Sequence, residues 1–119
     1  MFSVALCTYN GVKYIADQLD SIINQTRTVD EIIVSDDGST DGTLMILEEF
    51  AQKYSLLHYS VNTVRKGFKQ NFLDTIRQCK GDVVFLSDQD DKWYLNKVEF
   101  VLERFQKHPK IQLGFRCCR

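Results

Sequence analysis

The sequence has little proline, little glycine and no excess of charge of either sign, and each shortage excludes a class of protein. One proline and six glycines among 119 residues argue against a disordered or low-complexity chain. Lysine and arginine total 15 against 16 acidic residues, so a broad electrostatic surface for nucleic acid is not expected. Apolar runs are far shorter than the ~20 residues of a membrane span. The chain opens directly on a strand-like pattern rather than on a signal peptide.

The cysteines also lack the spacing that a metal site or a disulfide framework would need. The four cysteines are Cys7, Cys79, Cys117 and Cys118, and none of them forms a C-x-x-C pair. Cys7 and Cys79 lie within apolar patterns, so we expect both to be small core residues. Free cysteines favour a reducing compartment, and the sequence therefore predicts a cytoplasmic protein.

Short β-rich runs alternate with helical patterns along the whole chain. Apolar residues from Val12 to Ile23 are spaced 3, 4, 3 and 1 apart, which places them on one face of a helix. Asn10 is expected to cap that helix, and Thr40 or Asp41 the next one. The predicted strands span residues 2–7, 31–35, 56–61 and 82–87, and the predicted helices span 12–23, 44–51, 68–79 and 95–105, the last ended by His108 and Pro109.

This alternation predicts an α/β fold with a mostly parallel sheet and helices on both faces. The length suits a single domain over residues 1–119. Ligands of such sheets bind beyond the carboxyl ends of the strands. The segments that follow the predicted strands are therefore the place to look for function.

Asp88, Asp90 and Asp91 follow the fourth predicted strand. Three carboxylates within four residues repel one another unless a cation neutralises them. Carboxylates are hard oxygen ligands that suit Mg²⁺ or Mn²⁺, and magnesium commonly binds one or two of them together with substrate phosphates. The alternative is a solvated turn with a helix cap. The position after an apolar strand favours a metal-diphosphate site.

The other strand ends carry polar groups suited to a nucleotide. Gly38 permits a positive φ, so the turn it makes can present Asp37 to a base N–H or a ribose hydroxyl. The ring of Tyr9 offers a face for stacking. An ordinary turn or cap explains each of these residues equally well when it is taken alone. Polar or basic side chains that can also contact a nucleotide are Thr8, Asn10, Arg65 and Lys66.

Three segments together carry a resemblance to a known family. Residues 4–11, 33–43 and 85–93, in this order and at these spacings, resemble the nucleotide-binding half of a family 2 glycosyltransferase. The resemblance extends to about residue 111. It implies the Rossmann-like GT-A fold and transfer of a sugar from a nucleoside-diphosphate donor. Gln-Asp-Asp followed by Trp is similar to bacterial rhamnosyltransferase-like members, which build cell-surface polysaccharides at the inner face of the membrane.

The resemblance also implies roles for individual residues. Tyr9 corresponds to the aromatic residue that contacts the base, Asp37 to the aspartate that reads it, and Asp36 to a support of the same loop. Asp88 and Asp90 correspond to the Asp-x-Asp motif that binds metal and diphosphate, with Asp90 as the more direct ligand. The implied donor is a UDP- or dTDP-sugar, the cofactor Mg²⁺ or Mn²⁺, and the acceptor a glycan or lipid-linked sugar. The full predicted nucleotide-binding set is Thr8, Tyr9, Asn10, Asp36, Asp37, Arg65, Lys66 and Asp88.

The resemblance places the general base of an inverting reaction in a later, acceptor-binding half. We expect that half to lie outside this chain, so the predicted fold is truncated and no catalytic residue is assigned here. A non-catalytic, nucleotide-binding remnant is therefore an alternative to an enzyme. An apolar surface without its covering half can drive self-association, which leaves a homodimer open. A receiver domain or an Asp-x-Asp phosphatase is disfavoured, because its acidic pair would follow the first strand.

Overall fold

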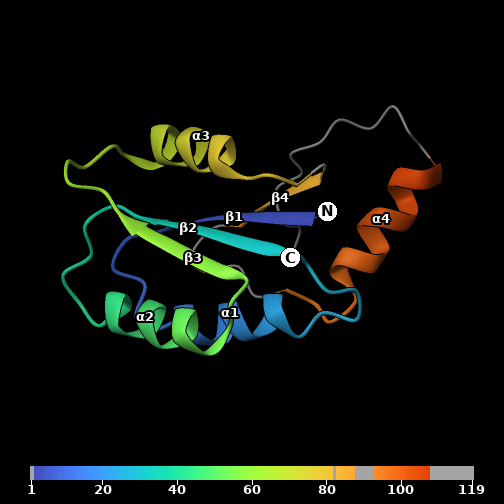
Figure 1. Ribbon diagram of the computed structural model, residues 1–119, viewed down its shortest axis with the longest axis horizontal. Helices are drawn as coiled ribbons and strands as arrows, with labels where there is room; N and C mark the ends of the chain where they lie inside the picture. The colour runs from blue at the N-terminus through green and yellow to red at the C-terminus, as the bar shows by residue number, and fades with distance from the viewer. Residues whose placement is uncertain (1, 82, 88–92, 108–119) are drawn as a thin grey trace.

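The computed structural model describes residues 2–81, 83–87 and 93–107. Strands and helices alternate along them, as predicted (Figure 1). In chain order, the elements are β1 (Phe2–Thr8), α1 (Ile15–Ile23), β2 (Glu31–Asp36), α2 (Thr43–Lys53), β3 (Leu57–Val61), α3 (Phe68–Gln78), β4 (Val83–Ser87) and α4 (Lys97–Lys107).

The strands form one sheet in the order β3-β2-β1-β4, and each neighbouring pair is parallel. Helices α1 and α2 lie on one face of this sheet and α3 on the other (Figure 1). The inner strands β1 and β2 are therefore buried along almost their whole length. Strands covered on both faces have near-continuous apolar sequences, which explains the Ile-Ile-Val run of β2. The prediction of a parallel α/β sheet with helices on both faces is confirmed.

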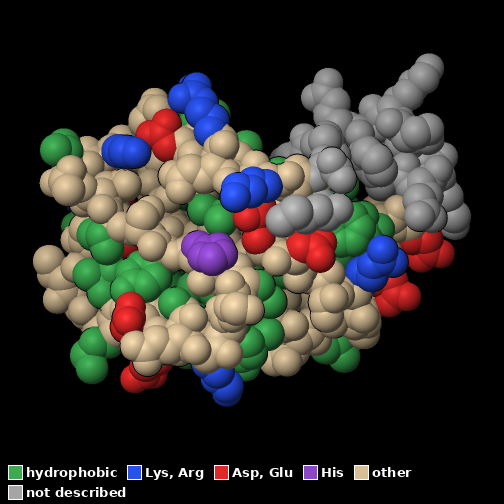
Figure 2. Space-filling view, in the orientation of Figure 1, with side chains coloured by type: hydrophobic (Ala, Val, Ile, Leu, Met, Phe, Trp, Pro, Cys, Tyr) green, Lys and Arg blue, Asp and Glu red, His purple; other side chains and the backbone are tan. Residues whose placement is uncertain are grey.

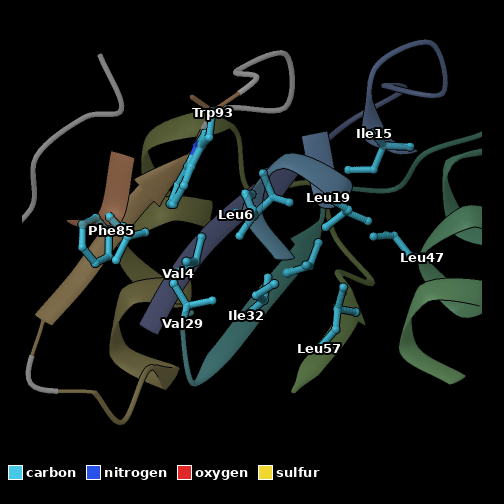
Figure 3. Close-up of a cluster of buried hydrophobic side chains, with 13 residues drawn as sticks. Val4, Leu6, Ile15, Leu19, Val29, Ile32, Leu47, Leu57, Phe85 and Trp93 are labelled. Carbon is cyan, nitrogen blue, oxygen red and sulfur yellow. The ribbon is translucent and has the colours of Figure 1, made fainter. Parts of the chain in front are cut away.

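The main core lies between the sheet and helices α1 and α2. Val4 and Leu6 of β1 pair with Ile32 and Val34 of β2, so these four side chains point to the same face. The apolar face of α1 packs onto them (Figure 3). Burial of each such side chain contributes roughly 1.5–3 kcal/mol, so this layer dominates the stability of the fold.

Helix α1 begins three residues later than its apolar pattern predicts. The carbonyl oxygen of Gly11 accepts hydrogen bonds from the amides of Tyr14 and Ile15, which makes a turn before the helix. Val12 is consequently 38% exposed instead of packing in the core. The prediction that Asn10 caps α1 is wrong, because Asn10 has a φ of +49° and lies before this turn.

The predicted caps of the second helix, Thr40 or Asp41, lie two residues and one residue before the observed cap. Helix α2 has Gly42 as its N-cap, and the carboxylate of Asp41 accepts a hydrogen bond from the Thr43 amide at 2.9 Å. Helix α4 begins at Lys97 rather than at residue 95. The stop signal at residues 108 and 109 lies outside the described residues.

Cys7 is buried, as predicted, and Cys79 is half-buried. Burial and the nearby Glu31 carboxylate raise the pKa of the Cys79 thiol to about 11, so it is not a reactive thiolate at neutral pH. Cys117 and Cys118 fall outside the part of the chain that the structure describes. In that same part, none of the helices has the length and apolarity that crossing a bilayer would require.

Candidate functional site

The strand register brings three loops to one edge of the sheet. Thr8 at the end of β1 pairs with Asp36 at the end of β2, which pairs in turn with Val61 at the end of β3. On the other side of β1, Leu6 pairs with Ser87, the last residue of β4. From β1 the chain proceeds through β2 to β3 at one edge of the sheet, and it then crosses back to β4 on the other side of β1. The point between β1 and β4 is therefore the topological switch point, where ligands of open α/β sheets bind.

Asp36 is fully buried and organises the loop after β2. One carboxylate oxygen accepts hydrogen bonds from the hydroxyls of Thr8 at 2.7 Å and Ser39 at 2.5 Å. The other accepts hydrogen bonds from the amides of Gly38 at 3.0 Å and Ser39 at 2.7 Å. A carboxylate offers about four acceptor positions, so these four bonds leave none for a ligand. Asp36 thus supports the loop and joins it to β1.

Asp37 is also nearly buried, but its acceptor positions are not all used. Its Oδ1 accepts hydrogen bonds from Asn62 Nδ2 at 3.0 Å and the Lys66 amide at 2.8 Å. Its Oδ2 accepts one from the Gly67 amide at 3.0 Å and lies 3.7 Å from Nε of Arg65. Among the described contacts, one acceptor position on Oδ2 is left for a further donor. Asp37 therefore holds the 62–67 segment and can still bind a ligand N–H.

The surroundings of Asp37 predict a measurable pH dependence. Burial alone would raise its pKa, but the hydrogen bonds from Lys66, Asn62 and Gly67 and the charge of Arg65 together lower the pKa below the ordinary 3.8. A lowered pKa in the folded state means that ionised Asp37 stabilises the protein above the unfolded pKa, and that this stability is lost as pH falls through the folded pKa. We expect the difference in unfolding free energy between the unaltered chain and Asp37→Asn to shrink as pH falls below the ordinary pKa of 3.8 and through the lowered folded pKa.

Urea unfolding at each pH measures this difference. Asp20→Asn, on the exposed face of α1, controls for the loss of a carboxylate elsewhere. A difference that stays constant over the whole range would mean that the Asp37 hydrogen bonds do not depend on its charge.

Tyr9 and Arg65 form a stack beside Asp37. The guanidinium carbon of Arg65 lies 3.9 Å from the centre of the Tyr9 ring, and Nη1 donates a hydrogen bond to the Tyr9 hydroxyl at 3.2 Å. Lys66 points elsewhere, because its ammonium pairs with Asp74 of α3 at 2.8 Å. The predicted residues Tyr9, Asp37 and Arg65 thus lie together, while Lys66 contacts the group through its backbone only.

Asn10 joins the first loop to the second. Its amide donates a hydrogen bond to Ser39 Oγ at 2.8 Å, and its side-chain oxygen accepts one from the Thr40 amide at 2.8 Å. The Gly11 amide donates to Thr43 Oγ1 at 3.0 Å. Asn10 therefore has a structural part in the site in addition to any contact with a ligand. The same holds for Thr8, whose hydroxyl donates a hydrogen bond to Asp36.

Sequence reasoning missed a set of polar side chains on and just after α1, of which Gln18 and Gln25 are buried and Ser21 is half-buried. Gln18 and Ser21 lie on the helix and Gln25 just beyond its end, and all three bond to residues near the end of β4 or the start of α4. The spacing of three residues between Gln18 and Ser21 places both on one face of α1. The sequence alone does not show whether that face is turned toward the end of β4 or toward solvent.

The acidic segment after β4 lies outside the described residues, so the structure does not show how Asp88 and Asp90 are placed. Within the described part of the chain, no three His, Cys, Asp or Glu side chains cluster closely enough to hold a metal ion. The end of β4 does direct the chain to the same edge as Thr8. Metal binding by Asp88 and Asp90 stays a prediction.

Comparison with known protein families finds one family that matches almost the whole chain. The family model described as "Glycosyl transferase family 2" matches residues 3–118. The chain belongs to glycosyl transferase family 2. The sequence prediction of the family is therefore confirmed, on nearly the full length of the chain.

Curated relatives in this family include several bacterial proteins. The dTDP-rhamnosyl transferase RfbG of Shigella flexneri is 39% identical over 103 residues, which cover 82% of this chain and 36% of the relative. Chondroitin synthase of Escherichia coli is 34% identical, over 90% of this chain and 16% of its own. The chain thus spans about a third of RfbG and less of chondroitin synthase.

Solved structures confirm the GT-A fold. Staphylococcus aureus TarS 1-349 in complex with UDP-GlcNAc superposes with a TM-score of 0.81 at 30% identity, covering 91% of this chain and 32% of that one. The mannosyltransferase PcManGT from Pyrobaculum calidifontis, in complex with GDP-Man and Mn²⁺, gives a TM-score of 0.80 at 27% identity, covering 92% of this chain and 33% of that one.

Proposed function

We propose that the chain is the donor-binding part of a glycosyltransferase that takes its sugar from a UDP- or dTDP-sugar. The observation that carries this proposal is the free acceptor position of Asp37 beside the Tyr9–Arg65 stack. A pyrimidine base offers a flat ring to stack and an N–H to donate. The stack and the carboxylate are therefore complementary to the two features of the base.

The remaining site residues support the base and the phosphates. Thr8, Asn10 and Asp36 hold the first two loops together, so they define where the base lies relative to the sheet edge. Arg65 stacks on Tyr9, and we assign its positive charge to the phosphates. We assign the Lys66 ammonium to the phosphates as well, once it exchanges its bond with Asp74 for a bond to the donor.

We propose that Mg²⁺ or Mn²⁺ binds with the diphosphate, held by Asp88 and Asp90. The donor set is two carboxylates, which suits these hard cations, and the Mn²⁺ complex of PcManGT supports metal use in a related fold. When bound, the cation would neutralise charge that develops on the leaving diphosphate. The protein's own part would be to supply these two carboxylates, which follow β4 in the sequence.

The reaction we propose inverts the sugar carbon. An acceptor hydroxyl attacks that carbon from the face opposite the diphosphate, after giving its proton to a general base. The carboxylates of Asp36 and Asp37 are already held by hydrogen bonds in the base loop, so neither is assigned as that base. Chondroitin synthase and the poly(ribitol-phosphate) β-N-acetylglucosaminyltransferase TarS act, by their names, on polymeric carbohydrates, which supports a glycan or lipid-linked acceptor in cell-surface polysaccharide synthesis. Such synthesis fits a location at the cytoplasmic face of the membrane.

Removal of the metal is expected to weaken nucleotide binding. In isothermal titration with UDP, and in parallel with dTDP, we expect the dissociation constant to rise about tenfold or more when EDTA replaces Mn²⁺, because a bridging contact to the diphosphate is lost. Uridine, which has no phosphate, is the matched control and should respond little to EDTA. Equal affinities with and without metal would contradict the role assigned to Asp88 and Asp90. Turnover with a panel of nucleotide-sugars then separates an enzyme from a nucleotide-binding remnant.

A further inference from the structure

The segment between β3 and β4, which contains α3, has a charge that the rest of the chain does not share. Residues 62–81 contain five of the 15 basic residues of the chain and one of its 16 acidic residues. The segment therefore carries a formal charge of +4, while the remaining residues together carry −5. This asymmetry indicates a surface suited to an anionic partner. The basic residues are Arg65, Lys66, Lys69, Arg77 and Lys80.

Helix α3 presents part of this charge on its outer face. The helix lies on the side of the sheet opposite α1 and α2 (Figure 1), and its residues Phe72 and Thr75 are buried. Lys69, Leu73 and Arg77 are exposed, and their spacing of four residues places them one turn apart on the same face. Leu73 therefore lies between two cations. Figure 2 shows Lys and Arg side chains over α3, along the upper rim of the molecule.

The one carboxylate of the segment, Asp74, offsets only part of this charge. The Lys66 ammonium lies 2.8 Å from Asp74 Oδ2, and Nη1 of Arg77 lies 3.5 Å from Oδ1. These contacts gather two cations around one anion beside the outer face of α3. The Arg77 side chain is still 74% exposed, so its guanidinium can also reach a partner in solvent.

Apolar side chains are exposed among the cations. Leu73 is 41% exposed on α3, and Val64 is 76% exposed in the loop that leads into the helix. A soluble polyanion would interact with the cations and gain little from these side chains. The surface of a bilayer interacts with both, because its headgroups attract cations and the boundary with the acyl chains accepts apolar groups.

From these observations we infer that the outer face of α3 binds the surface of a lipid bilayer that contains anionic lipids. Lys69 and Arg77 interact with the headgroups, and Leu73 enters the boundary between headgroups and acyl chains. Arg65 of the Tyr9–Arg65 stack lies three residues before α3, so this contact holds the candidate donor site close to the membrane. The inference rests on the proposed function, since it gives the proposed membrane location a defined surface.

Co-sedimentation with lipid vesicles tests this inference. We expect the chain to bind vesicles made of equal parts phosphatidylcholine and phosphatidylglycerol, to bind pure phosphatidylcholine much more weakly, and to dissociate at high salt. Lys69→Gln combined with Arg77→Gln should lower the partition coefficient about 30-fold, because each basic side chain near an anionic surface contributes roughly fivefold. Unchanged binding by this double variant would overturn the inference.

A second double variant controls for the loss of charge as such. Lys13→Gln combined with Lys53→Gln removes two exposed cations from the turn before α1 and from the last turn of α2. The total charge changes by the same amount, but the outer face of α3 is unaltered, so vesicle binding should change little. An equal loss in both double variants would overturn the inference, because binding would then depend on net charge alone.

Leu73→Ser distinguishes a bilayer from a soluble polyanion. We expect this variant to bind the anionic vesicles several-fold more weakly and to bind soluble polyphosphate as the unaltered chain does. Unchanged vesicle binding by Leu73→Ser, together with polyphosphate binding as tight as vesicle binding, would show that the partner is a soluble polyanion and would overturn the inference.

Titration of the same proteins with UDP and dTDP separates this inference from the proposed function. Nucleotide binding without vesicle binding would overturn the α3 surface and leave the proposed donor site standing. Vesicle binding without binding of either nucleotide would overturn the proposed donor site and leave the α3 surface standing.

Discussion

Replacing Asp36 with alanine is expected to lower the free energy of unfolding by roughly 3–5 kcal/mol. The carboxylate is fully buried, and the substitution strips the hydrogen-bond acceptor from two hydroxyls and two amides that water does not readily reach. Each buried donor left unsatisfied costs about 1–3 kcal/mol, although these costs do not simply add. Small domains are stable by only about 5–15 kcal/mol, so this loss is a large part of the total stability.

Urea unfolding followed by circular dichroism measures the loss. Asp36→Asn keeps one oxygen acceptor and should lose less stability than Asp36→Ala. Asp30→Ala is the control for an exposed aspartate, because the Asp30 carboxylate accepts a hydrogen bond from the Phe2 amide at the surface; its cost should be below about 1 kcal/mol. Similar losses in Asp30→Ala and Asp36→Ala would refute the central role of Asp36 in the loop.

Asp37→Ala is expected to weaken UDP binding in Mn²⁺ by about 2–3 kcal/mol, or roughly 30- to 150-fold. The substitution removes the acceptor proposed for the base N–H. It also frees the amides of Lys66 and Gly67, so the segment that carries Arg65 loses its fixed position beside Tyr9. Both effects act on the same ligand, which is why the expected loss exceeds that of one neutral hydrogen bond.

Asp41→Ala is the matched control for Asp37→Ala. The Asp41 carboxylate accepts hydrogen bonds from the amides of Thr43 and Val12, at the start of α2 and before α1, and it does not contact the Tyr9–Arg65 stack. Its removal should lower the melting temperature and leave UDP affinity unchanged. The reverse pattern, with Asp41 governing affinity and Asp37 only stability, would show that the base is bound by the other end of this loop.

The arrangement of the sheet was predictable because it depends on local patterns. The Ile-Ile-Val run of β2 and the apolar face of α1 are each formed by residues close together in the sequence, so both can be recognised from the sequence. The alternation of strands and helices then leaves few possible topologies. The residues at which the helices begin were less predictable. Val12 continues the apolar pattern of α1, yet the hydrogen bonds to the Gly11 carbonyl make a turn there and expose its side chain.

The site could be predicted in its residue types but not in its contacts. The pattern Asp-Asp-Gly-Ser after a strand indicates a loop with carboxylates, and it does not show which carboxylate is exposed. Asp36 is saturated by Thr8 and Ser39, while Asp37 binds a segment about 30 residues further along the chain. Partners at such distances follow from the strand register, which the sequence leaves open.

Gln18 illustrates the same limit from another side. A glutamine among apolar residues on α1 is consistent with a solvent-exposed position, and only the packing of α1 against the sheet shows that Ser87 lies opposite. The surface charge, by contrast, agrees with the composition. On the face shown in Figure 2, basic and acidic side chains are interspersed, in line with the near-zero net charge.

The contacts between the first two loops have a consequence for how the protein folds. Thr8 and Asp36 are 28 residues apart, Asn10 and Thr40 are 30 apart, and Gly11 and Thr43 are 32 apart. Such pairings form only after the chain between them has closed, which costs entropy before any bond is gained. The loops therefore acquire their shape when β1 and β2 align, and they lose it when those strands separate. Opening of this site and unfolding of the central sheet are in that sense one event.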